Sequence, residues 1–389
     1  MVAGLVGADM KESSVALSKS AANELSQARG GDVVDARSFA GYVGDRLDFS
    51  RLTLSLEVVA ACSLRCPGCW VAQSREMWTA RPEEIMPPIL FDAALRFGRE
   101  LGASKLTLLG GEPTLHPNLP ALINRATMIG YKVSVTTNGV CSQQRLSDVL
   151  NSGLHGISFS LDGSCSQIHD TLRPSPNGKS TFHLTLESLR RAVQLRSEHG
   201  YSVNVNHTIY PRNLHDAEAM IRLSARLGVD SIRLHFTLPG DFPEPDGRIS
   251  FLEPCKWLAL RNRIPDLIRE LRVPISAVPG YGELSVAAAK KRTTPYLNIQ
   301  PQGDIIPCAA YARLPAREQQ SVGRLLPTGG VLLNRLSSCE LGSNHCCGAM
   351  LRLIERLPVA VRNAIEQAGG LGCIILNGPL VHPASITPK

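Results

Sequence analysis

The fold of this chain is decided by the stretch Ala61-Cys62-Ser63-Leu64-Arg65-Cys66-Pro67-Gly68-Cys69-Trp70, which follows directly on the apolar run 52–59. The run predicts a buried β-strand, and the CxxxCxxC spacing lets three thiolates converge on one soft metal centre. A cubane iron–sulfur cluster normally takes one cysteine for each iron. With three cysteines, one iron keeps an open position, where it can bind a small chelating molecule and pass it an electron. The alternatives are a structural zinc site, a disulfide framework and scattered buried thiols.

Apolar, β-rich runs alternate with helical patterns from residue 52 onward. Strands are predicted at 52–59, 105–109, 132–137, 156–161, 202–209 and 231–236. Helices are predicted at 88–101, 119–128, 143–150, 182–197, 214–227 and 253–271, the last kinked or split by Pro265. Most of these strands are nearly continuous in apolar or β-branched residues, which is typical of a parallel sheet covered by helices. The predicted fold class is therefore α/β, a partial (β/α)6 TIM-like barrel followed by a small Cys-containing C-terminal domain.

Special residues stand where the first four predicted strands end. After the cysteines come Gly110-Gly111-Glu112-Pro113, Thr136-Thr137-Asn138-Gly139 and Ser160-Leu161-Asp162-Gly163. Each motif alone is explained by ordinary turn chemistry. Barrel enzymes, however, carry their chemistry at the carboxyl ends of the strands. Four such motifs in order on one rim therefore argue against zinc and for a reactive site there.

These motifs resemble those of radical S-adenosylmethionine (radical SAM) enzymes, and the chain is identified as a member of that superfamily. The resemblance implies a [4Fe-4S] cluster held by Cys62, Cys66 and Cys69, with S-adenosyl-L-methionine chelating the open iron. In this superfamily, reductive cleavage of the bound cofactor yields a 5′-deoxyadenosyl radical. Many relatives carry an aromatic residue just before the third cysteine, where this chain has Gly68. Trp70 either supplies that shielding surface or packs in the core.

The resemblance also implies a set of cofactor-binding residues, which are Gly110, Gly111, Glu112, Asn138, Ser160 and Arg173. In the family's GGEP motif, glycine carbonyls receive the methionine ammonium, and we expect Glu112 to anchor that loop. Ser160 stands where many relatives bind the ribose or the methionine carboxylate of the cofactor. Asn138, together with Thr137, is a candidate for contacting cofactor or substrate. Turn stabilisation is the alternative for Ser160 and Asn138.

A second resemblance follows the fourth strand, in Ile168-His169-Asp170-Thr171-Leu172-Arg173-Pro174 and then 178–182. It is similar to the HD-x-x-R…G-x-F stretch of the branch that modifies peptides and natural products. Arg173 either pairs with a carboxylate of the cofactor or substrate, or fixes its loop to Asp170. His207 and His235, late in the fifth and sixth strands, are either satisfied core histidines or functional groups on the same rim. No catalytic residue is assigned.

The alternation stops after about residue 273, and residues 296–308 predict a hairpin. This region partly resembles the auxiliary-cluster domains called SPASM and Twitch, through Gly303, Cys308, Cys339, Cys346 and Cys347. Those domains hold a second iron–sulfur cluster near the substrate, but the cysteine that the family places at 288–294 is missing. The four thiols suffice for one further [4Fe-4S] cluster, with Cys255 or Cys373 able to replace one. Buried thiols without metal are the alternative.

At 389 residues and 43% hydrophobic content, the chain can bury one large core and a smaller one. We expect a flexible or weakly helical extension over 1–48, the barrel over 49–272, and the SPASM/Twitch-like region with a C-terminal helix over 273–389. Eleven cysteines are too sparse for a disulfide scaffold and favour metal in a reducing cytoplasm. The net charge of +7 is mild, aromatics are 5%, and no long Lys/Arg block occurs. Nucleic-acid binding is therefore not indicated, and no apolar run reaches the length of a membrane span.

The function expected from these features is an enzyme that cleaves S-adenosylmethionine reductively and abstracts hydrogen from a substrate. A small natural-product or sugar-type substrate is favoured, with oxidation, epimerisation or rearrangement as the outcome. Maturation of a ribosomal peptide is the alternative within the superfamily. A non-catalytic zinc- or cluster-binding scaffold is the alternative of another class. The radical reading implies a reducing partner such as flavodoxin or ferredoxin.

Overall fold

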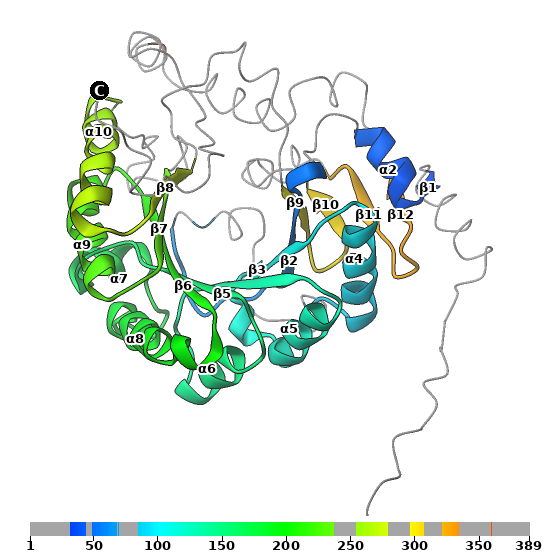
Figure 1. The fold of residues 1–389 in the computed structure, drawn as a ribbon, viewed down its shortest axis with the longest axis horizontal. Coiled ribbons are helices and arrows are strands. Elements are labelled where there is room, and N and C mark those ends of the chain that lie inside the picture. The colour runs from blue at the N-terminus through cyan, green and yellow to red at the C-terminus, as the bar shows by residue number, and fades with distance from the viewer. Residues whose placement is uncertain are drawn as a thin grey trace, which may run out of the picture.

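The structure is a computed structural model that describes residues 32–43, 49–67, 69, 85–236, 254–278, 296–306, 321–333 and 359. Within these residues, the strands form one twelve-stranded sheet in the order β1-β12-β11-β10-β9-β2-β3-β4-β5-β6-β7-β8. The sheet curves into an open ring that carries most of its helices on the outer side (Figure 1). The predicted α/β class and the partial barrel are confirmed.

Seven strands that follow one another in the sheet are parallel to their neighbours. They are β2 (Thr53–Val59), β3 (Lys105–Gly110), β4 (Lys132–Thr137), β5 (Gly156–Ser160), β6 (Ser202–Ile209), β7 (Ser231–Phe236) and β8 (Ile275–Val278). The six predicted strands correspond to β2 through β7. The four-residue β8 was not predicted, and it pairs with β7 in parallel register. The barrel sheet thus continues past residue 272, where we expected the barrel domain to end.

Every crossover between these parallel strands contains a helix. The long ones are α4 (Pro88–Glu100), α5 (Leu119–Met128), α6 (Gln143–Leu150), α8 (Thr181–His199), α9 (Ala217–Arg226) and α10 (Pro254–Leu271). Local chemistry sets their ends. The Ser142 side chain accepts the Arg145 N–H at the start of α6, and Gly200 closes α8 in the left-handed conformation. Helix α10 runs through Pro265 as one element, so a split there is wrong. Buried Leu267 and Ile268 show that packing offsets the lost hydrogen bond.

The two faces of the parallel strands differ in polarity. In β6, buried and half-buried residues alternate along the strand, and the buried set is apolar apart from His207. Parallel register aligns the other set into rows, Thr136-Ser158-Asn204-Ser231 and Ser160-Asn206-Arg233-Ser276. Because the described crossover helices cover the convex face (Figure 1), the prediction of nearly continuous apolar strands holds for that face. The concave face is lined with hydroxyl and amide groups.

A second group of strands extends the sheet beyond β2. These are β9 (Tyr296–Ile299), β10 (Asp304–Ile306), β11 (Gly323–Leu325) and β12 (Val331–Leu333). Strand β9 is parallel to β2, and β10, β11 and β12 continue in antiparallel pairing. Strands β9 and β10 form the predicted hairpin, which turns at Gly303 with φ 92°. A side chain there would also meet the carbonyl oxygen of Leu325, at 2.4 Å from its Cβ.

Residues 32–43 belong to the folded part of the chain. Strand β1 (Val33–Val34) pairs with β12, and helix α2 (Ala36–Val43) follows it. Phe39 of α2 is fully buried, and its ring lies edge-on to Phe97 of α4 with centroids 5.3 Å apart. This part of the expected 1–48 extension therefore packs against the barrel. The apolar α2 face is what attaches it.

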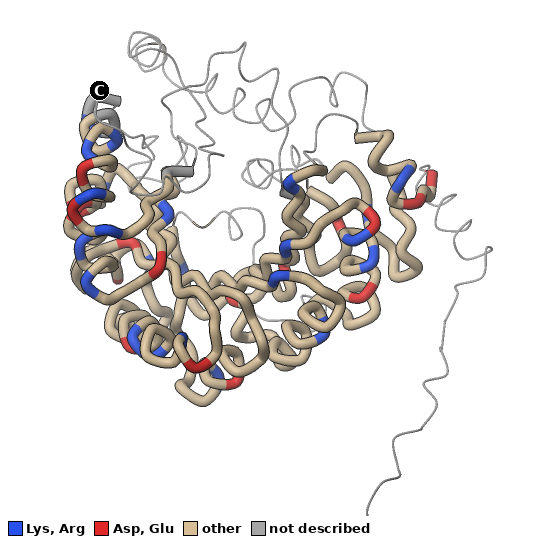
Figure 2. Tube along the Cα trace, viewed as in Figure 1, with Lys and Arg blue, Asp and Glu red and all other residues tan. Residues whose placement is uncertain are grey.

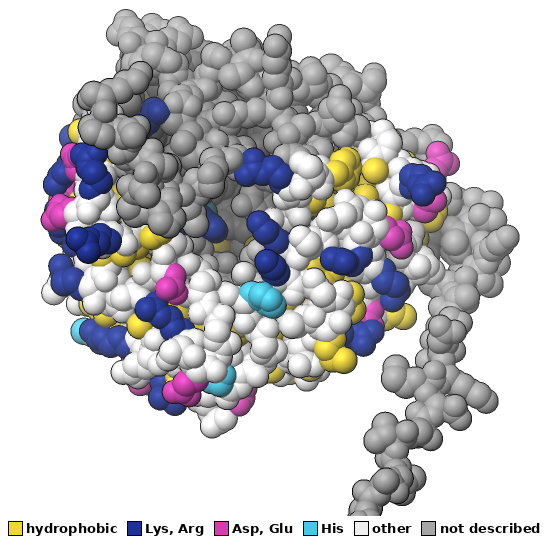
Figure 3. Space-filling view, in the orientation of Figure 1, with side chains coloured by type: hydrophobic (Ala, Val, Ile, Leu, Met, Phe, Trp, Pro, Cys, Tyr) yellow, Lys and Arg dark blue, Asp and Glu magenta, His cyan; other side chains and the backbone are white. Residues whose placement is uncertain are grey.

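Most charged residues lie on the helices and connecting segments rather than on the strands (Figure 2). On the face shown in Figure 3, basic and acidic side chains are interspersed over the described surface. Several form exposed ion pairs, such as that of Arg222 with Glu218 and Glu270. No described helix combines the length and the apolar character that crossing a bilayer requires.

Candidate active site

The three cysteines of the CxxxCxxC motif lie together just past the carboxyl end of β2. All three are free thiols with partly exposed side chains. The turn is closed by the Cys69 N–H, which donates to the Cys66 carbonyl oxygen at 3.1 Å. The loop is attached to the segment after β5 because the Arg65 N–H donates to the Pro174 carbonyl oxygen at 3.0 Å.

The electrostatics of the thiols also show that they are neighbours. Burial raises the pKa of Cys62 to about 12, and the charges of Glu112 and Cys69 act in the same direction. Burial likewise raises the pKa of Cys66 to about 12, against the opposing effect of the Arg173 guanidinium. Without a bound cation, the site therefore favours neutral thiols.

Gly110 and Gly111 hold the cysteine loop by backbone contact. Gly111 N–H donates to the Val59 carbonyl oxygen at 2.7 Å, and Glu112 N–H donates to the Ala61 carbonyl oxygen at 2.8 Å. A Cβ on Gly110 would lie 2.0 Å from the Val59 oxygen, and one on Gly111 would lie 2.1 Å from the Ala61 oxygen. Both positions therefore require glycine for close approach of two backbones. This clamping role comes in addition to the contact with the methionine ammonium that the resemblance implies for the GGEP motif.

Glu112 is a buried anchor between the ends of β3 and β4. Its Oε1 accepts from Thr114 N at 3.0 Å, from Thr114 Oγ1 at 2.7 Å and from Thr137 Oγ1 at 2.7 Å. Its Oε2 accepts from the Asn138 N–H at 2.7 Å. Burial raises the pKa of Glu112, and these four donors oppose that shift. The carboxylate thereby fixes Asn138 in the turn after β4.

Asn138 contacts the cysteine loop directly. Its Oδ1 accepts from the Val140 N–H at 2.8 Å, which orients the amide. Its Nδ2 donates to Ser63 Oγ at 3.3 Å and lies 3.8 Å from Cys62 Sγ, within hydrogen-bond reach of sulfur. The backbone oxygen of Asn138 accepts from Thr185 Oγ1 at 2.8 Å, which connects the turn to α8.

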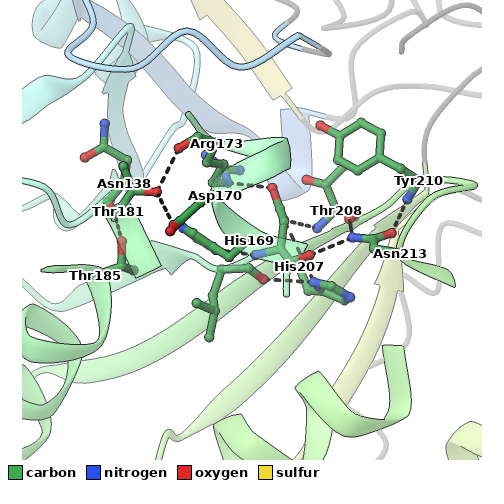
Figure 4. A network of polar contacts seen from close by, with 12 residues as sticks. Asn138, His169, Asp170, Arg173, Thr181, Thr185, His207, Thr208, Tyr210 and Asn213 are labelled. Atoms are coloured by element: carbon green, nitrogen blue, oxygen red, sulfur yellow. Dashed lines mark hydrogen bonds and ion pairs between the residues drawn. The ribbon is translucent and has the colours of Figure 1, made fainter. Parts of the chain in front are cut away.

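Asp162, at the turn after β5, is the centre of a polar network. Its partners Arg173, His169, Thr208 and Asn213 are labelled in Figure 4. Its Oδ2 forms an ion pair with Arg173 Nε at 2.5 Å, and its Oδ1 accepts from Thr208 N at 2.7 Å. Its backbone oxygen accepts from Asn213 Nδ2 at 2.8 Å, and its N–H donates to His169 Nδ1 at 3.2 Å. In the sequence, Asp162 is only part of an Asp-Gly turn, which does not predict this role.

Arg173 is not fixed to Asp170, so that alternative is wrong. Asp170 instead accepts from Phe182 N at 2.8 Å and from Thr181 Oγ1 at 3.0 Å, at the start of α8 (Figure 4). Asp170 belongs to helix α7 (Ser166–Leu172), which precedes Arg173. Asp162 contacts the same helix through its backbone N–H, which donates to His169 Nδ1. The Arg173 charge acts on Cys66, which places the guanidinium close to the cysteine loop.

The remaining candidates occupy different positions. Ser160 ends β5 on the concave face, in register with Asn206, and is 9% exposed. His207 is fully buried, with Nδ1 against the Leu161 oxygen at 2.8 Å, and burial lowers its pKa. His207 therefore does not face the concave space. His235 lies on the concave side of β7 and is partly exposed.

Several candidates lie outside the described residues. They are Gly68, Trp70, Cys308, Cys339, Cys346, Cys347 and Cys373, together with the side chain of Cys255. Arg233 is a further concave-face residue that the sequence analysis did not single out. Arg233 lies within a strand and not at a strand end, where the motifs are. Its alternation with the buried Ile232 and Leu234 in β7 is the pattern that indicates a position on the opposite face of the sheet.

Comparison with known proteins agrees with this geometry. Residues 56–224 match the family model of the radical SAM superfamily. SuiB from Streptococcus suis bound to its precursor peptide SuiA has a TM-score of 0.54 and 15% identity, over 74% of this chain and 65% of SuiB. SuiB bound to S-adenosylmethionine has a TM-score of 0.50 and 18% identity, over 67% of this chain and 60% of SuiB.

A third similar structure is anSMEcpe with bound AdoMet and the Cp18Cys peptide. Its TM-score is 0.51 at 16% identity, over 76% of this chain and 81% of that protein. The chain thus spans less than two thirds of the length of SuiB in these matches. At such identities the likeness shows a shared fold.

The superfamily uses a [4Fe-4S] cluster and S-adenosylmethionine, and the residues here fit that cluster. Iron binds thiolates, and the partly buried Cys62 and Cys66, whose pKa values burial raises to about 12, need a cationic partner to ionise. Among the described residues, no three His, Cys, Asp or Glu side chains converge on one metal ion. A cubane takes one thiolate at each iron, so Cys62, Cys66 and Cys69 would hold three of its four irons. Residues 56–224, which match the radical SAM superfamily model, contain this cysteine loop.

Proposed function

We propose that this chain is a radical SAM enzyme whose reaction takes place between the Cys62/Cys66/Cys69 loop and the concave face of the sheet. When bound, the cluster and S-adenosylmethionine supply a one-electron reductive cleavage and a 5′-deoxyadenosyl radical that abstracts hydrogen from the substrate. The observation that carries this proposal is the group of three neighbouring thiols, clamped by glycine backbone contacts at the strand ends. An acidic electron carrier such as flavodoxin or ferredoxin is the proposed reductant.

In this proposal, the chain's own residues fix the cofactor site. Gly110, Gly111 and Glu112 hold the cysteine loop against β3 and β4. Arg173 engages Asp162 through Nε, which leaves the other nitrogens of its fork for the carboxylate of the methionine moiety. Ser160 is proposed as a further polar contact to the cofactor, because it ends β5 on the concave face.

The substrate that fits the concave face is polar. Hydroxyl and amide groups line the rows that cross β4 to β8. Arg233 lies exposed in one row, in register with Asn206 and Ser276, and no described residue pairs with it. A hydroxyl-rich small molecule that carries a carboxylate or phosphate would satisfy both the lining and the arginine. We therefore favour a small natural-product or sugar-type substrate.

A peptide substrate is the second candidate. It is favoured by the fold that the chain shares with SuiB and anSMEcpe, both of which have been observed with bound peptides. An acidic side chain or a C-terminal carboxylate of the peptide would then meet Arg233. The net reaction, whether oxidation, epimerisation or rearrangement, depends on whether a second cluster accepts an electron.

The proposal includes a second [4Fe-4S] cluster, bound by Cys308, Cys339, Cys346 and Cys347. Four thiols are the number that a cubane cluster takes. It would lie in the chain segment that follows the β9–β10 hairpin. Such a cluster favours oxidation, because it removes one electron from the substrate radical. Without it, a redox-neutral outcome is favoured.

The proposal is tested by iron and sulfide analysis of anaerobically reconstituted protein, beside the triple variant C62A/C66A/C69A. We expect the triple variant to lose about four irons and to retain about four at the second site. Wild type should form 5′-deoxyadenosine from S-adenosylmethionine with dithionite, and the triple variant should form none. Bound zinc with no 5′-deoxyadenosine would support the scaffold alternative and exclude this function.

Substrate class is tested through coupling. A true substrate should stimulate 5′-deoxyadenosine formation above the rate seen with cofactor and reductant alone. In R233Q we expect the stimulation to be lost while the uncoupled rate is retained. R191Q on the outer face of α8 is the control and should keep both rates. Stimulation of R233Q equal to that of wild type would show that the substrate does not use this arginine.

A further inference from the structure

The three cysteine ligands do not receive the same hydrogen bonds from the protein. Cys62 Sγ accepts from the Leu64 N–H at 3.4 Å and from Asn138 Nδ2 at 3.8 Å. The first donor belongs to the cysteine loop itself. The second comes from the turn after β4, which is 76 residues away in sequence. Among the described residues, Cys62 is therefore the one of the three thiols that accepts a hydrogen bond from a side chain of the barrel.

The orientation of the Asn138 amide is fixed by its own contacts. Oδ1 accepts from the Val140 backbone N–H, and only the carbonyl end of an amide can do so. Nδ2 must then point toward the cysteine loop, where its two hydrogens serve Ser63 Oγ and Cys62 Sγ. The backbone of Asn138 is held by Glu112 Oε2 on one side and by Thr185 Oγ1 on the other.

We propose that Asn138 is a positioning residue that hydrogen-bonds the Cys62 ligand of the cluster and raises the cluster's reduction potential. This assignment rests on the cluster of the proposed function, and it differs from the cofactor or substrate contact that the resemblance implied for Asn138. A donor directed at a ligand sulfur stabilises the extra negative charge of the reduced cluster.

The direct test measures the reduced cluster by pulsed electron paramagnetic resonance, in wild type labelled with ¹⁵N at asparagine. We expect a ¹⁵N coupling to the cluster, together with an exchangeable proton that disappears in D₂O. Both signals should be absent in N138A. A labelled wild type without ¹⁵N coupling would overturn the proposal, and this measurement needs no variant to fold.

The energetic test is the cluster's midpoint potential, measured by redox titration without S-adenosylmethionine. N138A should shift the potential to a more negative value by about 59 mV, which corresponds to a tenfold change in a one-electron equilibrium. T185V is the matched control, because it removes a buried hydrogen bond to the Asn138 backbone oxygen and leaves the amide in place. T185V should keep the wild-type potential.

S63A removes the competing acceptor and should leave the potential at or above the wild-type value. A potential in N138A equal to that of wild type, or an equal shift in T185V, would contradict the assignment. Failure of the proposed function is recognised separately. In that case the triple cysteine variant keeps all of its iron, whereas here the cluster is present and only its potential and coupling are at issue.

Discussion

At the scale of single residues, the site depends on two glycines whose lack of a side chain lets two backbone segments approach closely. Gly111 has no room for a side chain because the carbonyl oxygens of Ala60 and Ala61 would lie 2.3 and 2.1 Å from its Cβ. Both are rigid backbone atoms, so the strain cannot be relieved by a side-chain rotation. The cysteine loop itself has to move.

For G111A we therefore predict displacement of the cysteine loop and loss of most of the cluster iron on reconstitution, with a stability cost of about 1–3 kcal/mol. Iron analysis and urea unfolding of the metal-free protein measure the two effects. G41A is the control, since Gly41 lies in helix α2 with nothing within 4 Å of its Cβ. It should leave the iron content unchanged and gain up to about 1 kcal/mol from helix propensity. Full iron content in G111A would contradict the clamp.

At the scale of elements, buried polar contacts join the turns after β5 and β6 to helix α7. Asp162 is 1% exposed and Arg173 has a side chain that is 16% exposed, so their ion pair has little contact with water. A buried charge that loses its partner is costly, because it cannot be solvated.

We predict that D162N destabilises the protein by about 3–5 kcal/mol, because it leaves the Arg173 charge without its partner. The matched control is D92N, which breaks the exposed pair with Arg125, whose side chain is 54% exposed. That change should cost no more than about 1 kcal/mol. Equilibrium urea unfolding of the metal-free variants compares them. Equal losses in D162N and D92N would show that the Asp162 pair is solvated.

Helix α7 also gives the fold a pH dependence. Burial lowers the pKa of His169 from 6.5 to about 4 in the folded protein, with the Arg173 charge acting in the same direction. Between these values the unfolded chain binds the extra proton, so stability falls as pH drops from 6.5 toward 4. We predict that this decrease, up to roughly 3 kcal/mol from His169, is reduced in H169N. H155Q, which changes an exposed histidine, should keep the wild-type profile of unfolding free energy against pH. An unchanged profile in H169N would contradict the assignment.

The motifs at the strand ends could be predicted because each lies within a few consecutive residues. Cys62, Gly110 and Asn138 stand out through their spacing and turn residues together with the resemblance to radical SAM motifs. The partners of Asp162 could not be found in this way, since Arg173 and Thr208 lie 11 and 46 residues from it. The polar concave face was missed for a similar reason. Single Ser, Thr and Asn residues between β-branched ones become a lining only when parallel register places them in rows.

At the scale of the whole molecule, one sheet joins both ends of the described chain. Strand β9 extends the barrel at β2, and β1 closes the far edge by pairing with β12. The sequence gives no sign of this, because β1 has two residues and β12 has three. Helix α2 covers the junction and contacts both β12 and α4.

The last prediction concerns this junction. F39A removes a fully buried ring that packs against Phe97, and we expect a loss of about 3–5 kcal/mol. Since α2 contacts β12 and α4, the loss should appear as faster amide hydrogen exchange in residues 321–333, while β5 and β6 keep their protection. I89A is the control, because Ile89 is 49% exposed and its truncation should change stability by less than about 0.5 kcal/mol. Uniformly faster exchange in F39A would instead mean that the N-terminal segment and the barrel unfold as one cooperative unit. Unchanged exchange would mean that α2 does not hold β12 in place.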